Sequence, residues 1–265
     1  MKILLIGYGK MGGAMVTRWL ASGVVDHVDA VSPHAKDKPA LANLTPYSSI
    51  EEWTNAKRTI DLIVLGIKPQ MFASVCPHLK PYLPSGVPVM SIAAGITLKT
   101  LHDLLGDDHA YIRTMPNTPS RIGKGITGYA LSDEKQKSMA DSLLKDLGLA
   151  IQLSDEALID SLSAISGSGP AYFYFFAEAL EKAAINANLA PDIAKMLAKQ
   201  TLIGAAALLE ETNDTPENQR TAVTSPNGST AAAIRVFEAN RGLESLVNEA
   251  VAAAIDRALA LGKIQ

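Results

Sequence analysis

A cluster of hydroxyl and small residues stands directly before an apolar helical pattern near the C-terminus. Residues 225–230 read Ser-Pro-Asn-Gly-Ser-Thr, and Ala-Ala-Ala-Ile follows at once. A helix that begins at Ser229 leaves N–H groups unpaired at its start, and one hydroxyl is enough to cap it. The surplus of donors around Asn227 and Gly228 predicts an anion-binding turn, for which a carboxylate is a suitable ligand. The alternative is an ordinary turn followed by a capped helix, and the pattern alone leaves both open.

A glycine motif near the N-terminus has the spacing of a phosphate-binding loop. Gly-x-Gly-x-x-Gly follows the aliphatic strand pattern of residues 2–6 and precedes a helical pattern. Such glycines permit a tight turn and a close backbone approach, while the helix N-terminus presents N–H groups and a positive dipole end to a pyrophosphate. This context favours dinucleotide binding over a purely structural glycine turn. The candidate cofactor-binding residues are Gly7, Tyr8, Gly9, Lys10, Met11 and Gly12.

The loop after the second predicted strand bears on the choice of dinucleotide. Enzymes that use NAD place an acid at the end of this strand, where it binds the ribose hydroxyls. Here Asp29 lies inside the strand pattern, and no acid follows it until Asp37. Ser32, His34 and Lys36 stand there instead and suit a 2′-phosphate, so we expect NADPH as the cofactor, with NADH as the second option. An ordinary solvated loop explains each of these three residues nearly as well.

Two further loops follow predicted strands, at the sheet edge where open α/β folds bind ligands. Residues 66–70 contain Lys68 and Pro69, and in residues 113–119 two prolines flank Asn117-Thr118. The Asn117 carboxamide carries both a donor and an acceptor that could bind a nicotinamide or a ribose. The alternatives are a local turn made by Asn117 and a solvated Lys68 side chain. We take Lys68, Pro69 and Asn117 as further cofactor-binding candidates.

The elements that position these motifs fall into two parts. In the first part, strand patterns alternate with helical patterns, which predicts a doubly wound parallel sheet. The strand patterns cover residues 2–6, 28–31, 61–67, 87–93, 111–114, 126–130 and 150–153, and the helical patterns cover 11–20, 69–79 and 98–105. Later patterns are helical, at residues 170–186, 191–211, 229–239 and 243–261. We therefore expect an α/β Rossmann-type domain at residues 1–154 and an all-α domain at 155–265.

The first long helix of the second part has a characteristic start. Residues 166–171 read Ser-Gly-Ser-Gly-Pro-Ala, and five aromatic residues follow at 172–176. Proline is common in the first turn of a helix, so we expect a helix near Pro170 with Ser168 or Gly169 as its cap. The aromatic run favours packing against neighbouring helices or a partner subunit over stacking on a cofactor.

Composition excludes several classes of function. The chain has 265 residues, 48% of them apolar, and a formal charge of −3. Lys and Arg are scattered, which argues against binding nucleic acid or a membrane surface. The four aliphatics of residues 3–6 are too few for a signal-peptide core, so we expect a cytoplasmic protein. The lone Cys76 excludes an internal disulfide, and its neighbour His78 does not complete a metal site, so we expect no metal.

Taken together, six motifs resemble pyrroline-5-carboxylate reductases. They are GYGKMG, GIKPQ, MPNTP, SGSGPAY, QTLIGAA and TSPNGSTAAAI, in this order over essentially the whole chain. Two positions depart from the family pattern. Asn227 stands where members usually have the first glycine of a Gly-Gly pair, and Pro33-His34 stands where members often have Asn-Arg.

The resemblance implies reduction of the cyclic imine 1-pyrroline-5-carboxylate to L-proline by NAD(P)H. It places the dinucleotide on the Gly7–Gly12 loop and the ribose and nicotinamide beside Lys68, Pro69 and Asn117. It places the substrate carboxylate on Ser225, Gly228, Ser229 and Thr230, and we take the Thr230 hydroxyl as the catalytic candidate that hydrogen-bonds the imine nitrogen. It further implies that the helical domain forms a homodimer or a higher homo-oligomer.

Two other functions remain open at this point. A β-hydroxyacid dehydrogenase has a similar domain plan but needs a lysine early in the first helix of the helical domain. The first lysine there is Lys182, about three turns into the helix. A protein that binds the dinucleotide without catalysing a reaction is the other alternative.

Overall fold

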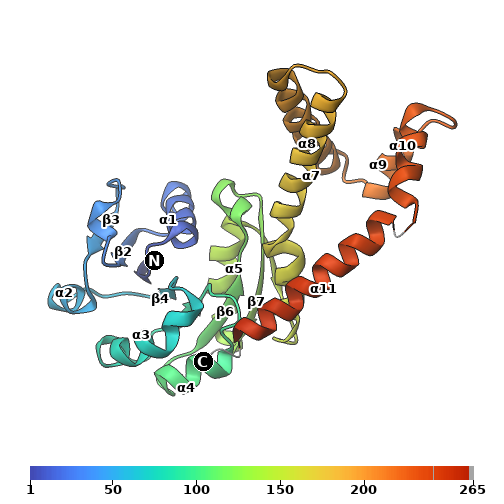
Figure 1. Cartoon of the computed structure of the whole chain (residues 1–265). Coiled ribbons are helices and arrows are strands. Elements are labelled where there is room, and N and C mark those ends of the chain that lie inside the picture. Colours follow the sequence, from blue (N-terminus) through green and yellow to red (C-terminus); the bar gives the residue numbers. More distant parts are fainter. Residues whose placement is uncertain (241, 263–265) are drawn as a thin grey trace. The chain divides into compact units, whose positions relative to one another are not determined.

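The computed structural model describes residues 1–240 and 242–262, and its N-terminal part contains an eight-stranded sheet (Figure 1). The strands are β1 (Lys2–Ile6), β2 (His27–Val31), β3 (Leu44–Tyr47), β4 (Leu62–Leu65), β5 (Val89–Ser91), β6 (Tyr111–Met115), β7 (Gly125–Leu131) and β8 (Gly148–Gln152). Their order is β3-β2-β1-β4-β5-β6-β7-β8, and β7 pairs antiparallel with β6. The order of the first six strands is that of a doubly wound dinucleotide-binding fold. The predicted Rossmann-type sheet is therefore confirmed, with an antiparallel extension at one edge.

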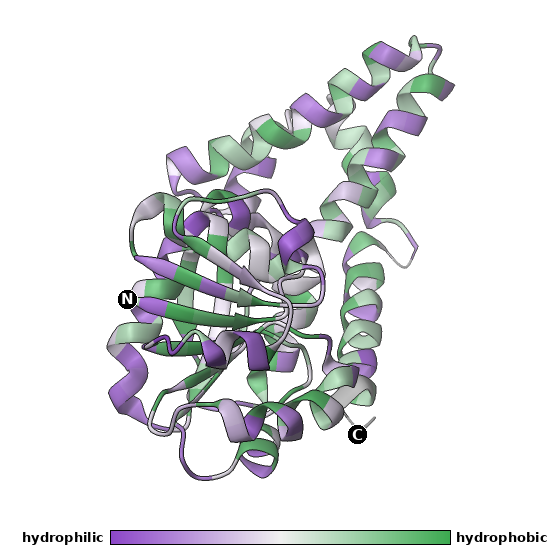
Figure 2. Ribbon diagram, turned by 90° about the vertical axis from the view of Figure 1, so that its left-hand side faces the viewer, coloured by the Kyte–Doolittle hydropathy of each residue, from purple (hydrophilic) through white to green (hydrophobic). Residues whose placement is uncertain are grey.

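Helices cover both faces of this sheet. They are α1 (Lys10–Ser22), α2 (Ile50–Asn55), α3 (Phe72–Leu79), α4 (Leu98–Leu105), α5 (Lys137–Asp146) and α6 (Leu158–Leu162). One apolar core contains Trp19 of α1 and Leu143 of α5, and the other contains Trp53 of α2, Phe72 of α3 and Leu101 of α4. The central strands carry apolar side chains on both faces, as expected for parallel strands that helices cover (Figure 2).

The single cysteine belongs to the second core. Cys76 on α3 is fully buried, and this burial raises the pKa of its thiol to about 12. Its neighbour His78 points to a different partner, with Nε2 2.9 Å from the Glu51 carboxylate. Among the described residues, no group of three or more His, Cys, Asp and Glu side chains could hold a metal ion.

A buried cation lies in the middle of β6. Arg113 is 2% exposed, and its guanidinium donates to Glu156 at 3.1 Å and to Asp160 at 2.7 Å. The same Glu156 oxygen accepts the backbone N–H of Leu98 at the start of α4, at 2.7 Å. The Arg113 and Glu156 side chains together thus connect β6, α4 and α6 next to the loop that carries Asn117.

We expect Arg113→Met to destabilise the protein strongly, because it leaves two partly buried carboxylates without their cation. Removing one partner of a buried ion pair costs about 3–5 kcal/mol of unfolding free energy. The control is Lys99→Met, which breaks the exposed Lys99–Asp103 pair at 2.6 Å and is expected to cost at most about 1 kcal/mol. Urea unfolding of the two variants measures both effects, and equal losses would contradict this role of Arg113.

The second part of the chain is helical. Its helices are α7 (Gly169–Asn186), α8 (Pro191–Thr212), α9 (Pro216–Ala222), α10 (Ser229–Glu238) and α11 (Gly242–Gly262). No described residue after Gln152 belongs to a strand, so the predicted all-α region is confirmed. Within the described chain, no helix is long and apolar enough to cross a membrane.

The described residues separate into two compact units. One comprises residues 1–168 together with 254–262, and the other comprises residues 169–253. The predicted boundary at residue 154 rests on where strand patterns give way to helical patterns, which is a different criterion, and it stays a prediction.

The expected cap of α7 is wrong. Gly169 is the first residue of the helix, and Ser168 has helical dihedral angles (φ −84°, ψ −28°) where a cap would be extended. The Ser168 N–H donates to the Ser163 carbonyl at 3.0 Å, which closes a π-turn over Ser163–Gly167. Pro170 has no N–H for the Ser166 carbonyl four residues before it. That carbonyl instead accepts from Asn117 Nδ2 at 3.0 Å.

Candidate dinucleotide and anion sites

The two glycine loops of the first unit meet at the point where the strand order reverses. Gly7 follows β1 and has φ +94°, a conformation that favours glycine. A Cβ on Gly7 would lie 2.7 Å from the carbonyl carbon of Gly66, which follows the neighbouring strand β4. The two loops therefore pack backbone against backbone, and this switch point is where doubly wound sheets bind ligands.

The start of α1 has the properties of a phosphate site. Gly9 is the N-cap residue without a side-chain cap, and the first turn carries no acid. Gly13 N–H donates to the Gly9 carbonyl at 2.9 Å, so the N–H groups of Lys10, Met11 and Gly12 precede the first intrahelical bond. A Cβ on Gly9 would meet nothing within 4 Å. This space lets a ligand approach the backbone closely, so the site fits a pyrophosphate.

A cavity of about 710 Å³ lies over this helix start. Its lining residues are Tyr8, Gly9, Lys10, Met11, Gly13, Ala14, Thr17, Lys38, Pro39, Thr118 and Arg121. Tyr8 is buried, which raises the pKa of its phenol. Among these described lining residues are three cations and no carboxylate, so the cavity suits a ligand that carries several negative charges.

The predicted 2′-phosphate residues lie outside this lining, and the side chains of His34 and Lys36 have partners within the chain. Ser32 N–H donates to the Tyr47 carbonyl at 3.1 Å, and His34 Nδ1 lies 3.2 Å from Asp37 Oδ2. Lys36 Nζ donates to Glu52 at 2.6 Å, and this hydrogen bond holds the pKa of Glu52 below its usual range. The assignment of Ser32, His34 and Lys36 to the cofactor stays a prediction.

The acid inside β2 is engaged elsewhere. Asp29 is 3% exposed, and its Oδ2 accepts from Trp53 Nε1 at 2.9 Å. This agrees with the expectation that Asp29 does not reach the ribose hydroxyls. The absence of a free acid at the end of β2 fits NADPH better than NADH.

The two other predicted cofactor loops differ in exposure. Lys68 is exposed and precedes a short 3₁₀ turn that begins at Pro69. Asn117 is buried, with Nδ2 donating to the Ser166 carbonyl and Oδ1 accepting from Ile126 N–H, each at 3.0 Å. The Asn117 side chain therefore connects distant segments, unlike a local turn. One Nδ2 hydrogen and one Oδ1 lone pair remain for another partner.

The hydroxyl-rich turn of the second unit precedes α10 as predicted. Asn227 has φ +57°, and the Gly228 N–H donates to the Ser225 carbonyl at 3.1 Å, which closes the turn. A Cβ on Gly228 would lie 2.5 Å from Ser225 Oγ, so the hydroxyl packs against the bare glycine. The left-handed angle at Asn227 also explains why asparagine can replace glycine there.

No hydroxyl caps α10. Gly228 is its N-cap residue without a side-chain cap bond, and Ala232 N–H donates to the Gly228 carbonyl at 3.1 Å. The N–H groups of Ser229, Thr230 and Ala231 therefore precede the first intrahelical bond. The capped-helix alternative is wrong, while the turn itself is present. An open helix start beside three hydroxyls can bind an anion.

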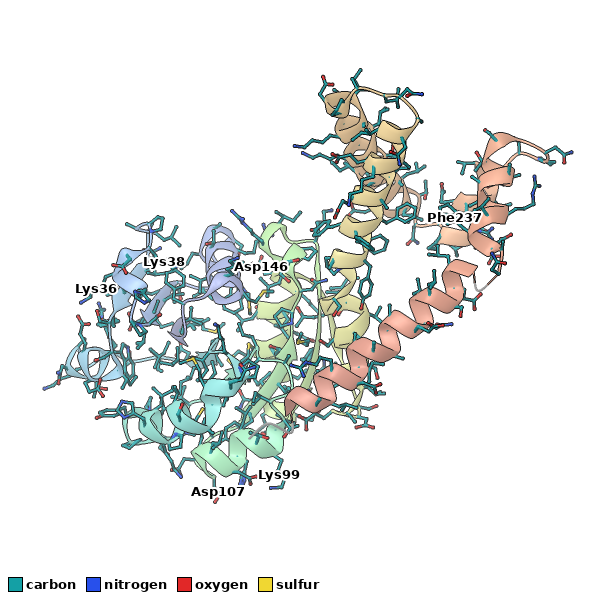
Figure 3. The ribbon with its side chains drawn as sticks, in the orientation of Figure 1. Lys36, Lys38, Lys99, Asp107, Asp146 and Phe237 are labelled. Carbon is teal, nitrogen blue, oxygen red and sulfur yellow. The ribbon has the colours of Figure 1, made fainter. Side chains whose placement is uncertain are left out.

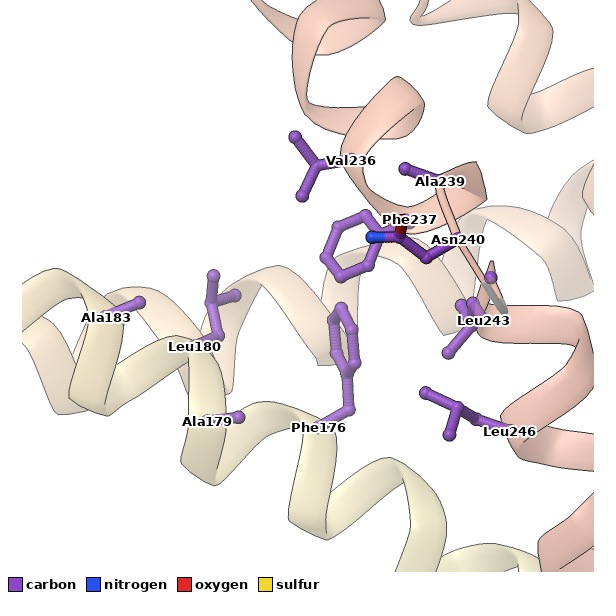
Figure 4. A pocket seen from close by; sticks show the side chains of 11 residues that line it. Phe176, Ala179, Leu180, Ala183, Val236, Phe237, Ala239, Asn240, Leu243 and Leu246 are labelled. Carbon is purple, nitrogen blue, oxygen red and sulfur yellow. The ribbon is translucent and has the colours of Figure 1, made fainter.

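A separate apolar pocket of about 660 Å³ lies within the second unit (Figure 4). Phe176 of α7 and Phe237 of α10 face each other there, with ring centroids 6.0 Å apart. Among its described lining residues, Asn240 carries the one polar side chain. The pocket therefore does not suit a phosphate or a carboxylate. Phe173 and Phe175 of α7 are also exposed. Exposed aromatic side chains of this kind are typical of a surface that a partner chain covers.

Sequence reasoning missed seven of the described residues that line the dinucleotide cavity, among them Lys38, Thr118 and Arg121. Lys38 lies two residues beyond the predicted Lys36, and the other two follow Asn117 in a short 3₁₀ turn that begins at Thr118. Their positions in the sequence were a weak signal, because only the fold brings these segments to the start of α1.

Two family models match the chain. The one described as pyrroline-5-carboxylate reductase dimerisation matches residues 156–261, and the one described as NADP oxidoreductase, coenzyme F420-dependent, matches residues 2–95. Among curated relatives, the pyrroline-5-carboxylate reductase of Pseudomonas aeruginosa is 37% identical and the alignment covers 99% of this chain and 97% of that protein. Pyrroline-5-carboxylate reductase 2 of Bacillus subtilis is 34% identical, with 93% and 90% covered.

Solved structures give the same result. A pyrroline-5-carboxylate reductase from Coxiella burnetii superposes with a TM-score of 0.84 at 33% identity, covering 98% of each chain. The Plasmodium falciparum pyrroline carboxylate reductase, solved with NADP bound, superposes with a TM-score of 0.85 at 28% identity, covering 99% of this chain and 98% of that one.

The fold and the glycine loop thus define an NADP-binding oxidoreductase with a Rossmann domain and a helical dimerisation domain. The identity to curated relatives over nearly the whole chain specifies it further: the chain belongs to the pyrroline-5-carboxylate reductase family. The predicted family and the predicted homo-oligomer are confirmed.

Proposed function

We propose that this chain reduces 1-pyrroline-5-carboxylate to L-proline with NADPH, in the cytoplasm, as a homodimer or a higher homo-oligomer. The observation that carries the proposal is the uncapped start of α10 on the Ser225–Gly228 turn, in a chain of this family. We further propose that residues 1–154 bind the dinucleotide and that residues 155–265 bind the substrate and form the dimer.

The first unit binds and orients the cofactor. The open start of α1 and the bare Gly9 receive the pyrophosphate, and Gly7 and Gly12 hold the turn that presents them. Tyr8, Lys10 and Met11 line the same cavity. Lys68, Pro69 and Asn117 remain the candidates for the ribose and nicotinamide side. When bound, NADPH supplies the hydride from C4 of its nicotinamide.

The turn before α10 binds the substrate carboxylate. The N–H groups of Ser229 and Thr230 offer two donors at the positive end of the helix dipole. The hydroxyls of Ser225 and Ser229 can add further hydrogen bonds, and the absence of a Cβ at Gly228 keeps the backbone accessible. Holding the carboxylate also fixes the ring that contains the imine, and such positioning supplies much of the rate.

Thr230 assists the imine nitrogen. The imine carbon accepts a hydride more readily when its nitrogen is hydrogen-bonded or protonated. Thr230 follows the carboxylate-binding turn directly and is half-buried at the start of α10, and its hydroxyl does not cap the helix. The segment of residues 224–234 contains neither an acid nor a histidine. We therefore assign hydrogen bonding of the nitrogen to the Thr230 hydroxyl.

A steady-state assay tests the proposal. Purified protein is incubated with NADPH or NADH, with and without 1-pyrroline-5-carboxylate, while cofactor oxidation and proline are measured together. We expect oxidation that depends on the imine, with one proline formed per cofactor oxidised. A folded protein that binds NADPH but oxidises neither cofactor with this imine would refute the proposal. In a separate incubation with a β-oxo acid in place of the imine, oxidation of NADPH with formation of the β-hydroxyacid would instead support the dehydrogenase alternative.

A further inference from the structure

We propose that Lys38 is the cation that selects NADPH over NADH by pairing with the 2′-phosphate. Lys38 lines the dinucleotide cavity over the start of α1, whereas Lys36 does not. The inference rests on the proposed use of a nicotinamide dinucleotide, and it names the residue of this chain that determines which dinucleotide is bound.

The cavity has more positive charge than a pyrophosphate alone requires. A pyrophosphate can be held by the open N–H groups of α1 and by Lys10, which stands at the first position of that helix. Arg121 and Lys38 also line the cavity and come from separate segments, one after β6 and one after β2. The loop after β2 is where this fold recognises the ribose 2′ position, so Lys38 is the cation placed for the 2′-phosphate.

Lys36 and Lys38 lie on the same loop after β2 (Figure 3), but they differ in their partners. Lys36 Nζ is committed to Glu52 at 2.6 Å, and the second Glu52 oxygen accepts the Ser48 N–H at 2.7 Å. Lys38, by contrast, has no carboxylate partner among the described residues. Lys36 must give up its exposed ion pair with Glu52 to bind a phosphate, which adds a small free-energy cost that Lys38 does not have.

The backbone conformation also restricts the direction of the Lys38 side chain. Lys38 N–H donates to the Ala35 carbonyl at 3.3 Å, which ends a short 3₁₀ turn. Pro39 follows and restricts Lys38 to an extended conformation, and the observed angles are φ −82° and ψ 152°. The direction in which the Lys38 side chain leaves the main chain is therefore set before the ligand binds, which reduces the entropy lost on binding.

The test compares binding of the two cofactors without any imine. Calorimetry gives the dissociation constants of NADPH, NADH, 2′-AMP and 5′-AMP for the wild type, Lys38→Gln and Lys36→Gln. The control is Lys99→Gln, which removes the same charge from an exposed helix position that pairs with Asp103. We expect Lys38→Gln to weaken NADPH and 2′-AMP binding about tenfold or more, as for the loss of a charge-assisted hydrogen bond. NADH and 5′-AMP binding should change by less than about twofold, and Lys38→Arg should retain the preference for NADPH.

Three results would overturn the inference. If Lys38→Gln weakened the binding of NADPH and NADH equally, Lys38 would be assigned to the pyrophosphate. A loss of NADPH binding in Lys36→Gln with none in Lys38→Gln would assign selection to Lys36. Equal dissociation constants for NADPH and NADH in the wild type would show that the protein does not select NADPH, and would contradict the role of Lys38. Because the experiment contains no imine, a chain that selects NADPH through Lys38 but makes no proline would contradict the proposed function alone.

Discussion

Thr230→Ala is expected to lower kcat/KM for 1-pyrroline-5-carboxylate about 100-fold, the typical loss when one hydrogen bond to the reacting group is removed. The loss should fall on kcat, because the bond to the imine nitrogen strengthens as the hydride arrives. The backbone N–H groups that bind the carboxylate remain, so KM should change little. The dissociation constant of NADPH should stay at the wild-type value.

Two variants separate the hydroxyl of Thr230 from its neighbours. Thr230→Ser keeps the hydroxyl and is expected to retain most of the activity. Ser225→Ala removes a hydroxyl that packs against Gly228 and is expected to raise KM more than it lowers kcat, because its role is in carboxylate binding. Since no hydroxyl caps α10, the melting temperature of Thr230→Ala should remain near that of the wild type. Unchanged kcat and KM in Thr230→Ala would remove Thr230 from the mechanism.

Gly9→Ala should abolish most NADPH binding and leave the fold intact. The added Cβ meets no protein atom within 4 Å, and Gly9 has φ −84°, which alanine adopts without strain. The methyl group occupies the space through which the pyrophosphate reaches the N–H groups of α1. Losing two charge-assisted hydrogen bonds of about 1.5–3 kcal/mol each weakens binding at least about 100-fold.

Gly7→Ala provides the contrast for this prediction. A Cβ at Gly7 would lie 2.7 Å from the Gly66 carbonyl carbon, and the residue has φ +94°. Gly7→Ala should therefore lower both the melting temperature and NADPH binding, whereas Gly9→Ala should lower NADPH binding alone. Thermal unfolding and calorimetry of the two variants check this difference. A Gly9→Ala protein that binds NADPH like the wild type would show that the pyrophosphate does not lie on this turn.

The parts of the fold that the sequence predicted well have strong local patterns. The aliphatic run of residues 2–6 and the amphipathic run of 98–105 coincide with β1 and α4. The sequence did not predict β3, because Pro46 interrupts its apolar pattern. A proline is tolerated there since β3 is an edge strand of the sheet. The sequence also did not predict α2, because this short helix buries only Ile50 and Trp53 and so has a weak apolar pattern.

The candidate sites could be predicted only as far as local sequence determines them. The glycine loop and the turn before α10 are contiguous in the sequence, and both have the conformations that their residues favour. The partners of Lys36 and Asn117 could not be predicted, because Glu52 and Ser166 come from segments that only the tertiary fold brings near. The same is true of the cavity that joins Lys38 and Arg121 to the start of α1.

The central claim is that a hydride passes from the nicotinamide to the imine carbon of 1-pyrroline-5-carboxylate. The most direct measurement uses NADPH deuterated at both C4 positions and examines the proline by mass spectrometry. We expect proline that is heavier by a single deuterium, located on the ring carbon that was double-bonded to nitrogen in the imine. Proline without deuterium, or no proline while the labelled cofactor stays bound and unoxidised, would contradict the account.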